Sequence, residues 1–223
     1  MGSDPSVAYE SQASAQPRPF SEARAVFGQT MGLVAFTLAF FALGAYIGRD
    51  LSGGTGIVCF IAAIVLLFGL NVAVRRSESL AIAMLFGVGL LLGMGMGPVL
   101  NAYAQADPSA VWQAAGATAL FVSALGAYGY ATNRDLSSWG RTLFFLLLGV
   151  LVLGLVFVFV NIPNENVIWA VLGLVLFGAY TIFDFNRLRR AGMESAVPIA
   201  AGIFLDIVNI FQFFLMLFGG GRD

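Results

Sequence analysis

The sequence predicts an all-α membrane protein with seven transmembrane helices. Of its 223 residues, 59% are hydrophobic and only 10% are charged, whereas a soluble domain carries about 25% charged residues. The mean hydropathy is +0.89. Seven apolar segments follow one another, each close to the roughly 20 residues that a helix needs to cross a bilayer.

The chain divides into an arm, one membrane domain and a short tail. Residues 1–25 begin with a stretch rich in Ser, Gln and Pro, which predicts a disordered cytoplasmic arm. Residues 26–218 form the seven-helix domain, and residues 219–223 form a short outer tail. The predicted spans are 26–48, 55–74, 79–100, 112–132, 141–161, 166–188 and 197–218.

The first three spans each carry a distinctive feature. The first is too long and too far from the N-terminus for a cleaved signal peptide. The second holds the single cysteine, Cys59, as a small buried hydrophobe. In the third, Gly89, Gly93 and Gly97 recur on one helix face and allow close approach, either to another helix of the chain or to a second copy. Pro98 predicts a kink near its outer end.

The later spans have recognisable ends. The fourth ends near Arg134 and Asp135, which we expect to be a solvated pair at the cytoplasmic boundary, with Asp135 or Ser137 capping the fifth helix. Gly192 ends the sixth helix and Pro198 opens the seventh. Connections are short, so helices adjacent in sequence should be adjacent in space.

The basic residues predict the orientation. All eleven are Arg, and seven spans place nine of them on one side, with Arg49 and Arg222 on the other. The positive-inside rule then puts the N-terminus in the cytoplasm and the C-terminus outside. Net charge is -1, which argues against a nucleic-acid partner. The absence of His and of a second Cys removes the usual metal ligands and proton shuttle.

Asp184 and Asp206 are the acids set inside the long apolar segments. A carboxylate in lipid costs about 2.5–3.5 kcal/mol even on lenient insertion scales, so such a residue is a functional-site hypothesis. Each lies eleven residues from Ser195, in the turn between the last two spans. An antiparallel helix pair would therefore hold both at similar depth. Asn209 shares a helix face with Asp206.

Paired carboxylates in a low-dielectric site share a proton and titrate as a unit. They are also hard oxygen ligands suited to Ca²⁺, although two are too few for tight binding, so any calcium would be transient and no resident cofactor is expected. Alternatively, each Asp only hydrogen-bonds a neighbouring helix through Tyr180, Thr181 or Asn209 and serves packing.

Four motifs carry a resemblance to a known family. YTIFDFN at 180–186 and IFLDIVNIF at 203–211 resemble the last two helices of the Bax inhibitor-1 (TMBIM) family, bacterial YccA-like branch. GPVLNAY at 97–103 and TNRDLS at 132–137 resemble its third-helix end and the loop between its fourth and fifth helices. The resemblance covers all seven spans and leaves only the N-terminal arm outside.

The resemblance implies a fold and a function. Six helices should surround a central C-terminal helix, and the protein should be a non-enzymatic, pH-sensitive Ca²⁺ leak channel of a bacterial inner membrane. Asp184 and Asp206 match the proton-sharing pair of the family, with Tyr180 and Asn209 as supporting polar groups. Related proteins pair this site with a basic residue, for which Arg75 is the best match and Arg76 the next. Both could equally be positive-inside anchors.

Two other functions compete with a channel. YccA-like proteins resemble modulators of the membrane-anchored protease FtsH, and the N-terminal arm could be the segment that engages it. An intramembrane aspartyl protease also needs two Asp residues as acid and base. Here, however, the run before Asp206 is Gly-Ile-Phe-Leu instead of a G-x-G pattern, and a P-A-L motif is missing.

Overall fold

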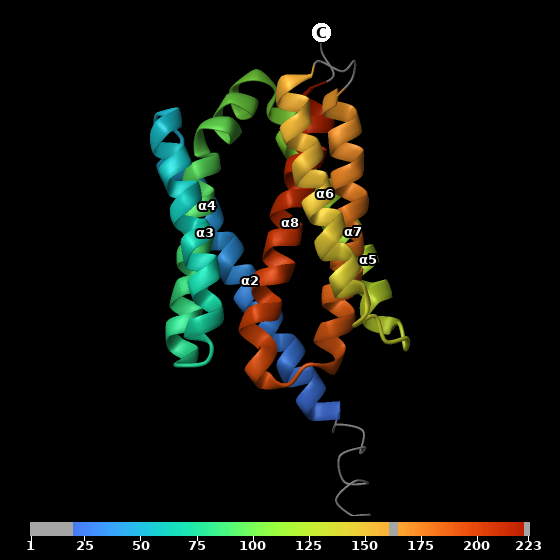
Figure 1. Cartoon of the computed structure of the whole chain (residues 1–223). Helices are drawn as coiled ribbons and strands as arrows, with labels where there is room; N and C mark the ends of the chain where they lie inside the picture. The colour runs from blue at the N-terminus through green and yellow to red at the C-terminus, as the bar shows by residue number, and fades with distance from the viewer. Residues whose placement is uncertain (1–19, 161–164, 221–223) are drawn as a thin grey trace, which may run out of the picture.

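A computed structural model describes residues 20–160 and 165–220, and these residues form seven long helices and a single 3-10 turn (Figure 1). All seven are long and apolar enough to cross a membrane, which confirms the predicted number of spans. The elements are α2 (Phe20–Gly48), α3 (Gly53–Ala73), α4 (Glu78–Ala106), α5 (Pro108–Ala131), α6 (Trp139–Phe159), α7 (Glu165–Arg190), η1 (Met193–Ser195) and α8 (Ala196–Gly219).

Three helices, α3, α4 and α5, begin at a residue whose side chain caps them, whereas α6 and α8 begin without a side-chain cap. Ser77 caps α4, its hydroxyl accepting a hydrogen bond from the Leu80 N–H at 3.4 Å. Asp107 ends α4 and accepts from the Ser109 N–H at 3.0 Å, so it also caps α5, whose first residue is a proline. α2 begins at Phe20, inside the segment predicted as an arm, and residues 1–19 lie outside the described residues.

The C-terminal helix is the centre of the molecule. Figure 1 shows α8 between two groups of helices, α2–α4 on one side and α5–α7 on the other. α8 packs on α7, α5 and α2, while α3 lies outside on α4 and α6 on α7. Its large apolar side chains Ile199, Ile203, Phe204 and Ile210 are fully buried. The expected seven-helix fold with a central C-terminal helix is confirmed, with α3 and α6 in a second layer outside α4 and α7.

The glycine face of α4 packs against α2. A Cβ atom at Gly93 would lie 2.0 Å from the Phe41 backbone oxygen, and one at Gly44 would lie 2.1 Å from the Leu90 backbone oxygen. Each helix therefore presents glycine to the backbone of the other, which is the close approach that small residues permit. The spacing predicted from the sequence serves packing within the chain.

α4 contains Pro98 without losing its helical continuity from Glu78 to Ala106. Figure 1 shows the C-terminal end of α4 leaning across toward the start of α5. A proline cannot donate the backbone hydrogen bond of its position, which favours such a change of direction there.

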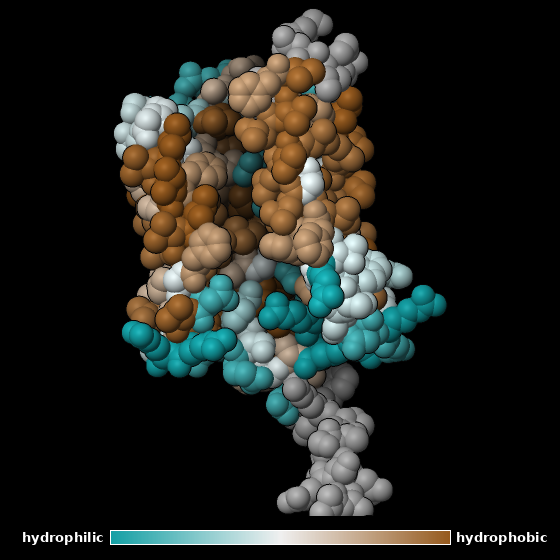
Figure 2. All heavy atoms as spheres, in the orientation of Figure 1, coloured by the Kyte–Doolittle hydropathy of each residue, from teal (hydrophilic) through white to brown (hydrophobic). Residues whose placement is uncertain are grey.

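The outer surface has the polarity of a membrane protein. Large hydrophobic side chains on the outer helices face outward, among them Phe68, Leu120 and Phe159, each at least 75% exposed. Figure 2 shows a tall hydrophobic band with hydrophilic surface gathered at the end where the α7–α8 turn lies in Figure 1. The band is hollowed between the two groups of helices, and hydrophilic surface lies deep in the hollow.

Candidate functional site

The two acids lie inside the bundle on neighbouring antiparallel helices. Asp184 on α7 and Asp206 on α8 are 5% and 3% exposed. α7 and α8 pack together along their length and are joined by the short turn that contains η1. Since both carboxyls are buried in the protein, neither faces lipid.

Gly202 brings the Asp184 carboxylate onto α8. A Cβ atom at Gly202 would lie only 2.1 Å from Asp184 Oδ2, so the carboxylate occupies the place of a missing side chain. Gly202 and Asp206 are four residues apart on one helix and therefore share a face, with about 5–6 Å between such positions. The structure thus brings the two acids together at one patch of α8.

Asp206 has few polar neighbours. Its Oδ2 atom is buried and has no hydrogen-bond partner among the described residues. The groups that act on its charge are Asp184 and the side chain of Thr181. The Thr181 hydroxyl also donates to the Phe177 backbone oxygen at 2.8 Å, so its single proton is divided between that oxygen and Asp206.

Tyr180 and Asn209, which we expected to support the acid pair, make different contacts. Tyr180 is half-buried and interacts electrostatically with Asp206 and Asp184. Asn209 donates its side-chain N–H to the Leu205 backbone oxygen at 2.8 Å, within its own helix. Tyr180 is therefore the member of this predicted set that interacts with the acids.

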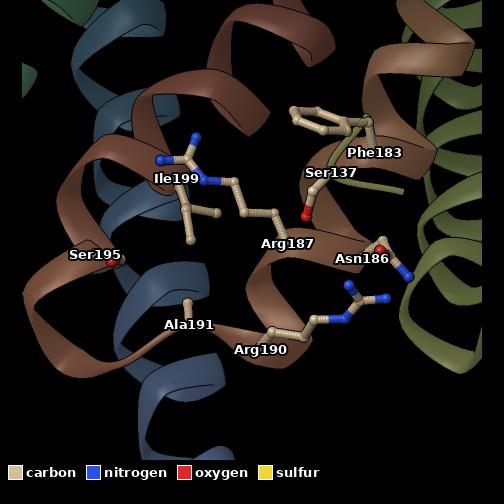
Figure 3. A pocket seen from close by; sticks show the side chains of 8 residues that line it. All are labelled: Ser137, Phe183, Asn186, Arg187, Arg190, Ala191, Ser195 and Ile199. Atoms are coloured by element: carbon tan, nitrogen blue, oxygen red, sulfur yellow. The ribbon is translucent and has the colours of Figure 1, made fainter. Parts of the chain in front are cut away.

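The cation whose charge acts on Asp184 is Arg187, three residues further along α7. Figure 3 shows its side chain extending from α7 toward Ile199 on α8, in a pocket of about 330 Å³ at the end of the bundle that holds the α7–α8 turn. Arg75 and Arg76 line a different pocket with Asn71 and Val72. Within residues 20–160 and 165–220, no ion pair joins Arg75 or Arg76 to either acid.

Asn186 anchors the loop between α5 and α6 to the same end of α7. Its Oδ1 accepts from the buried Leu136 N–H at 3.3 Å, and its Nδ2 donates to the backbone oxygens of Gly129, Thr132 and Arg134 at 3.1–3.2 Å. The sequence contains Asn186 within the motif at 180–186, two residues after Asp184. Nothing in the apolar pattern, however, indicates this role.

Arg189 and Arg190 add to this anchor. Arg189 donates to the Thr132 backbone oxygen and to Asn133 Oδ1, both at 2.6 Å. Asp135 forms an ion pair with Arg190, whereas we expected Arg134 as its partner. Hydrogen bonds from the hydroxyl and N–H of Ser137, together with Arg190, lower the pKa of Asp135 to about 2.

The described residues contain no group of three or more His, Cys, Asp or Glu side chains that could hold a metal ion. Asp184 and Asp206 are thus two carboxylates without a third acidic ligand close by. Such a set suits brief contact with a hard cation better than a resident metal site.

Comparisons with known proteins place the chain in a family. The family described as "Inhibitor of apoptosis-promoting Bax1" matches residues 23–223. An uncharacterized protein of Helicobacter pylori J99 is 32% identical over 163 residues, which cover 73% of this chain and 70% of that protein. A protein of Deinococcus radiodurans is 28% identical over 95% of this chain and 96% of its own length.

A third relative is a protein of a bacterial inner membrane. The inner membrane protein YbhL of Escherichia coli K12 is 27% identical over 176 residues, 73% of each chain. With seven apolar helices in this chain, the similarity supports a bacterial inner-membrane protein. The match over nearly the whole sequence, together with the seven-helix fold, shows that this chain belongs to the Bax inhibitor-1 family.

Proposed function

We propose that this chain is a pH-sensitive cation leak channel for Ca²⁺, in which Asp184 and Asp206 share a proton that holds α7 against α8. One observation carries the proposal. The Asp184 carboxylate lies in the place of a side chain at Gly202, one helical turn from Asp206. Two buried acids from different helices therefore occupy one small, mostly apolar region.

A proton shared by Asp184 and Asp206 would reduce the repulsion between the two carboxylates and would provide a hydrogen bond that they otherwise lack. Two carboxylates this close repel each other when both are ionised, and a low dielectric strengthens that repulsion. A proton between the acids would also give the buried Asp206 Oδ2 atom a hydrogen-bond partner, which it otherwise lacks among the described residues. Loss of the proton would favour separation of α7 from α8 and would leave negative charge for a cation to approach.

The surroundings of the acid pair suit the passage of Ca²⁺ better than its stable binding. Hard carboxylate oxygens attract Ca²⁺, and a permeation path needs sites that release the ion again. The hollow between the two groups of helices, with hydrophilic surface inside it, gives water a route into the membrane region (Figure 2). The proposal assigns no enzymatic step to the pair.

Ca²⁺ flux through purified protein in liposomes tests the proposal. Wild type should show a leak that changes with pH, and Asp206→Asn should show one that does not, because an amide cannot exchange the proton. Asp135→Asn is the matched control, since Asp135 lies outside the spans and, with a pKa of about 2, stays ionised over the working range. A wild-type pH profile in Asp206→Asn would refute the mechanism.

The protease-modulator function stays a prediction. It depends on the N-terminal arm, of which residues 1–19 lie outside the described residues. Deleting residues 2–19 and following the stability of substrates of the membrane protease would test it separately, because the deletion leaves both acids in place.

A further inference from the structure

A continuous apolar groove lies between α2 and α5. One pocket of about 640 Å³ is lined by residues of both helices, from Arg24 and Phe27 to Ala127 and Tyr130. A second, of about 410 Å³, continues deeper to Ile207 and Val208 of α8. The two pockets share Met31, Val122 and Ser123, and we call them together the α2–α5 groove.

The first pocket has the length of one lipid leaflet. It follows α2 from Ala23 to Met31 and α5 from Val122 to Ala131, which correspond to about 12–14 Å at 1.5 Å per residue. Half of the hydrocarbon core of a bilayer is about 15 Å. A chain entering from the cytoplasmic end would therefore reach the end of this pocket near the bilayer centre.

The first pocket has a mostly apolar lining, with Ser123 and Tyr130 among its few polar side chains. An acyl chain has no hydrogen-bonding group along its length, so it can lie against such a lining without leaving a polar group unpaired. A hydrocarbon chain therefore fits the chemistry of the pocket.

A positively charged residue lies at the entrance of the α2–α5 groove. Arg24 is exposed at the cytoplasmic end of the groove, and it forms no hydrogen bond or ion pair with another residue of the described ranges. A guanidinium is a strong ligand for phosphate. The groove thus combines a phosphate ligand with an apolar channel below it, which is the polarity of a phospholipid.

We propose that the α2–α5 groove binds one acyl chain of a cytoplasmic-leaflet phospholipid, whose phosphate lies on Arg24. The deeper pocket reaches Ile207, the residue after Asp206, so a bound chain would extend toward α8 beside the acid pair. The site does not depend on the proposed function, because it follows from the groove and Arg24 alone.

Photo-crosslinking tests this site in the full chain. The protein is reconstituted in vesicles of phosphatidylcholine and phosphatidylglycerol that contain phosphatidylglycerol with a photoactivatable acyl chain, and labelled peptides are identified by mass spectrometry. We expect labelling on the groove faces of α2 and α5. Ala127→Trp should abolish it by filling the groove, whereas Ala124→Trp, equally exposed on α5 but outside the lining, should not.

The contact between Arg24 and the lipid phosphate is tested by a separate pair of variants. Arg24→Gln should lower groove labelling roughly fivefold, which corresponds to about 1 kcal/mol per basic residue at an anionic surface. Arg76→Gln, an exposed cytoplasmic arginine outside the groove, should leave labelling unchanged. Equal loss with photoactivatable phosphatidylcholine would still support a phosphate contact, since both lipids carry one.

Three results would overturn the proposal. The first is equal groove labelling in Ala127→Trp and Ala124→Trp, provided that both keep wild-type helical content. The second is no loss in Arg24→Gln. The third is labelling that appears only after deletion of residues 2–19, which would assign the groove to the N-terminal arm of the chain. Ser123→Phe provides a second groove-filling variant if Ala127→Trp does not fold.

Discussion

At the scale of single residues, Gly202 determines where the Asp184 carboxylate lies. An added Cβ would be 2.1 Å from Asp184 Oδ2. Ordinary van der Waals contact begins near 3.4 Å, so the carboxylate of a Gly202→Ala variant must move by about 1 Å. We therefore predict that the midpoint of the pH response of the Ca²⁺ leak shifts by about one pH unit or more, which takes only about 1.4 kcal/mol.

The measurement is the liposome flux assay across pH, with circular dichroism to verify that the helices form. Gly116→Ala is the matched control, because a Cβ atom at exposed Gly116 on α5 meets nothing within 4 Å. An unchanged midpoint in Gly202→Ala would show that the position of Asp184 on α8 does not matter for the response.

Arg187 gives a second residue-scale prediction, which distinguishes it from Arg75. A nearby positive charge favours the ionised carboxylate, and Arg187 is the cation that acts on Asp184. Arg187→Gln should therefore move the midpoint of the pH response to higher pH. Arg75→Gln, just after the end of α3, should leave it in place. The opposite result would favour the partner implied by the family resemblance.

The two acids could be predicted from the sequence, and their packing could not. A charged residue in an apolar run is conspicuous because burial of a charge is costly, so Asp184 and Asp206 can be identified without a structure. The contact with Gly202 depends on the rotation of α8 about its axis, and polar residues such as Asp206 and Asn209 do not show which face of α8 meets α7. The sequence also gives no sign that Arg187 acts on Asp184, because an arginine near the end of an apolar span is equally typical of a residue that sets the orientation.

At the scale of elements, Asn186 joins α7 to the loop that links α5 and α6. It supplies the acceptor for the buried Leu136 N–H and donates to three backbone oxygens. Asn186→Ala would leave the buried Leu136 N–H without its acceptor, whereas the Thr132 and Arg134 oxygens would keep Arg189 and Arg190 as donors. An orphaned buried group costs about 1–3 kcal/mol. We predict a destabilisation of that order, measured as a lower midpoint of thermal unfolding in detergent.

Asn133→Ala is the control for this effect. Its Oδ1 accepts one exposed hydrogen bond from Arg189, which water can replace. It should therefore change the unfolding midpoint much less. Equal midpoints for Asn186→Ala and wild type would show that the loop holds its position without this anchor.

The number and order of the helices were predictable, while some of their ends were not. Hydropathy detects apolar length, so all seven spans appear in the sequence near their observed positions. It does not detect polar turns that continue a helix. α2 therefore starts at Phe20 and not near residue 26, and α4 continues to Ala106 through Asn101-Ala-Tyr-Ala-Gln-Ala.

At the scale of the whole molecule, α8 connects two groups of helices that touch each other little. α4 meets α5 and α2 meets α7 over short stretches, whereas α8 packs on members of both groups. The hollow in Figure 2 and the α2–α5 groove are consequences of this arrangement. A change at the acid pair between α7 and α8 would therefore alter the contact between the groups.

The orientation of this molecule in the membrane is the last prediction. Nine of eleven arginines fall on the side of the α7–α8 turn, so that side should be cytoplasmic. In a Cys59→Ala background, Gly54→Cys at the start of α3 should react with a membrane-impermeant maleimide in intact spheroplasts. Ser138→Cys, before α6, should react only after permeabilisation. Both positions are exposed, so access decides the outcome. The reverse pattern would place the acid pair and the Arg187 pocket toward the outer side, and the lipid phosphate proposed for Arg24 would then belong to the outer leaflet.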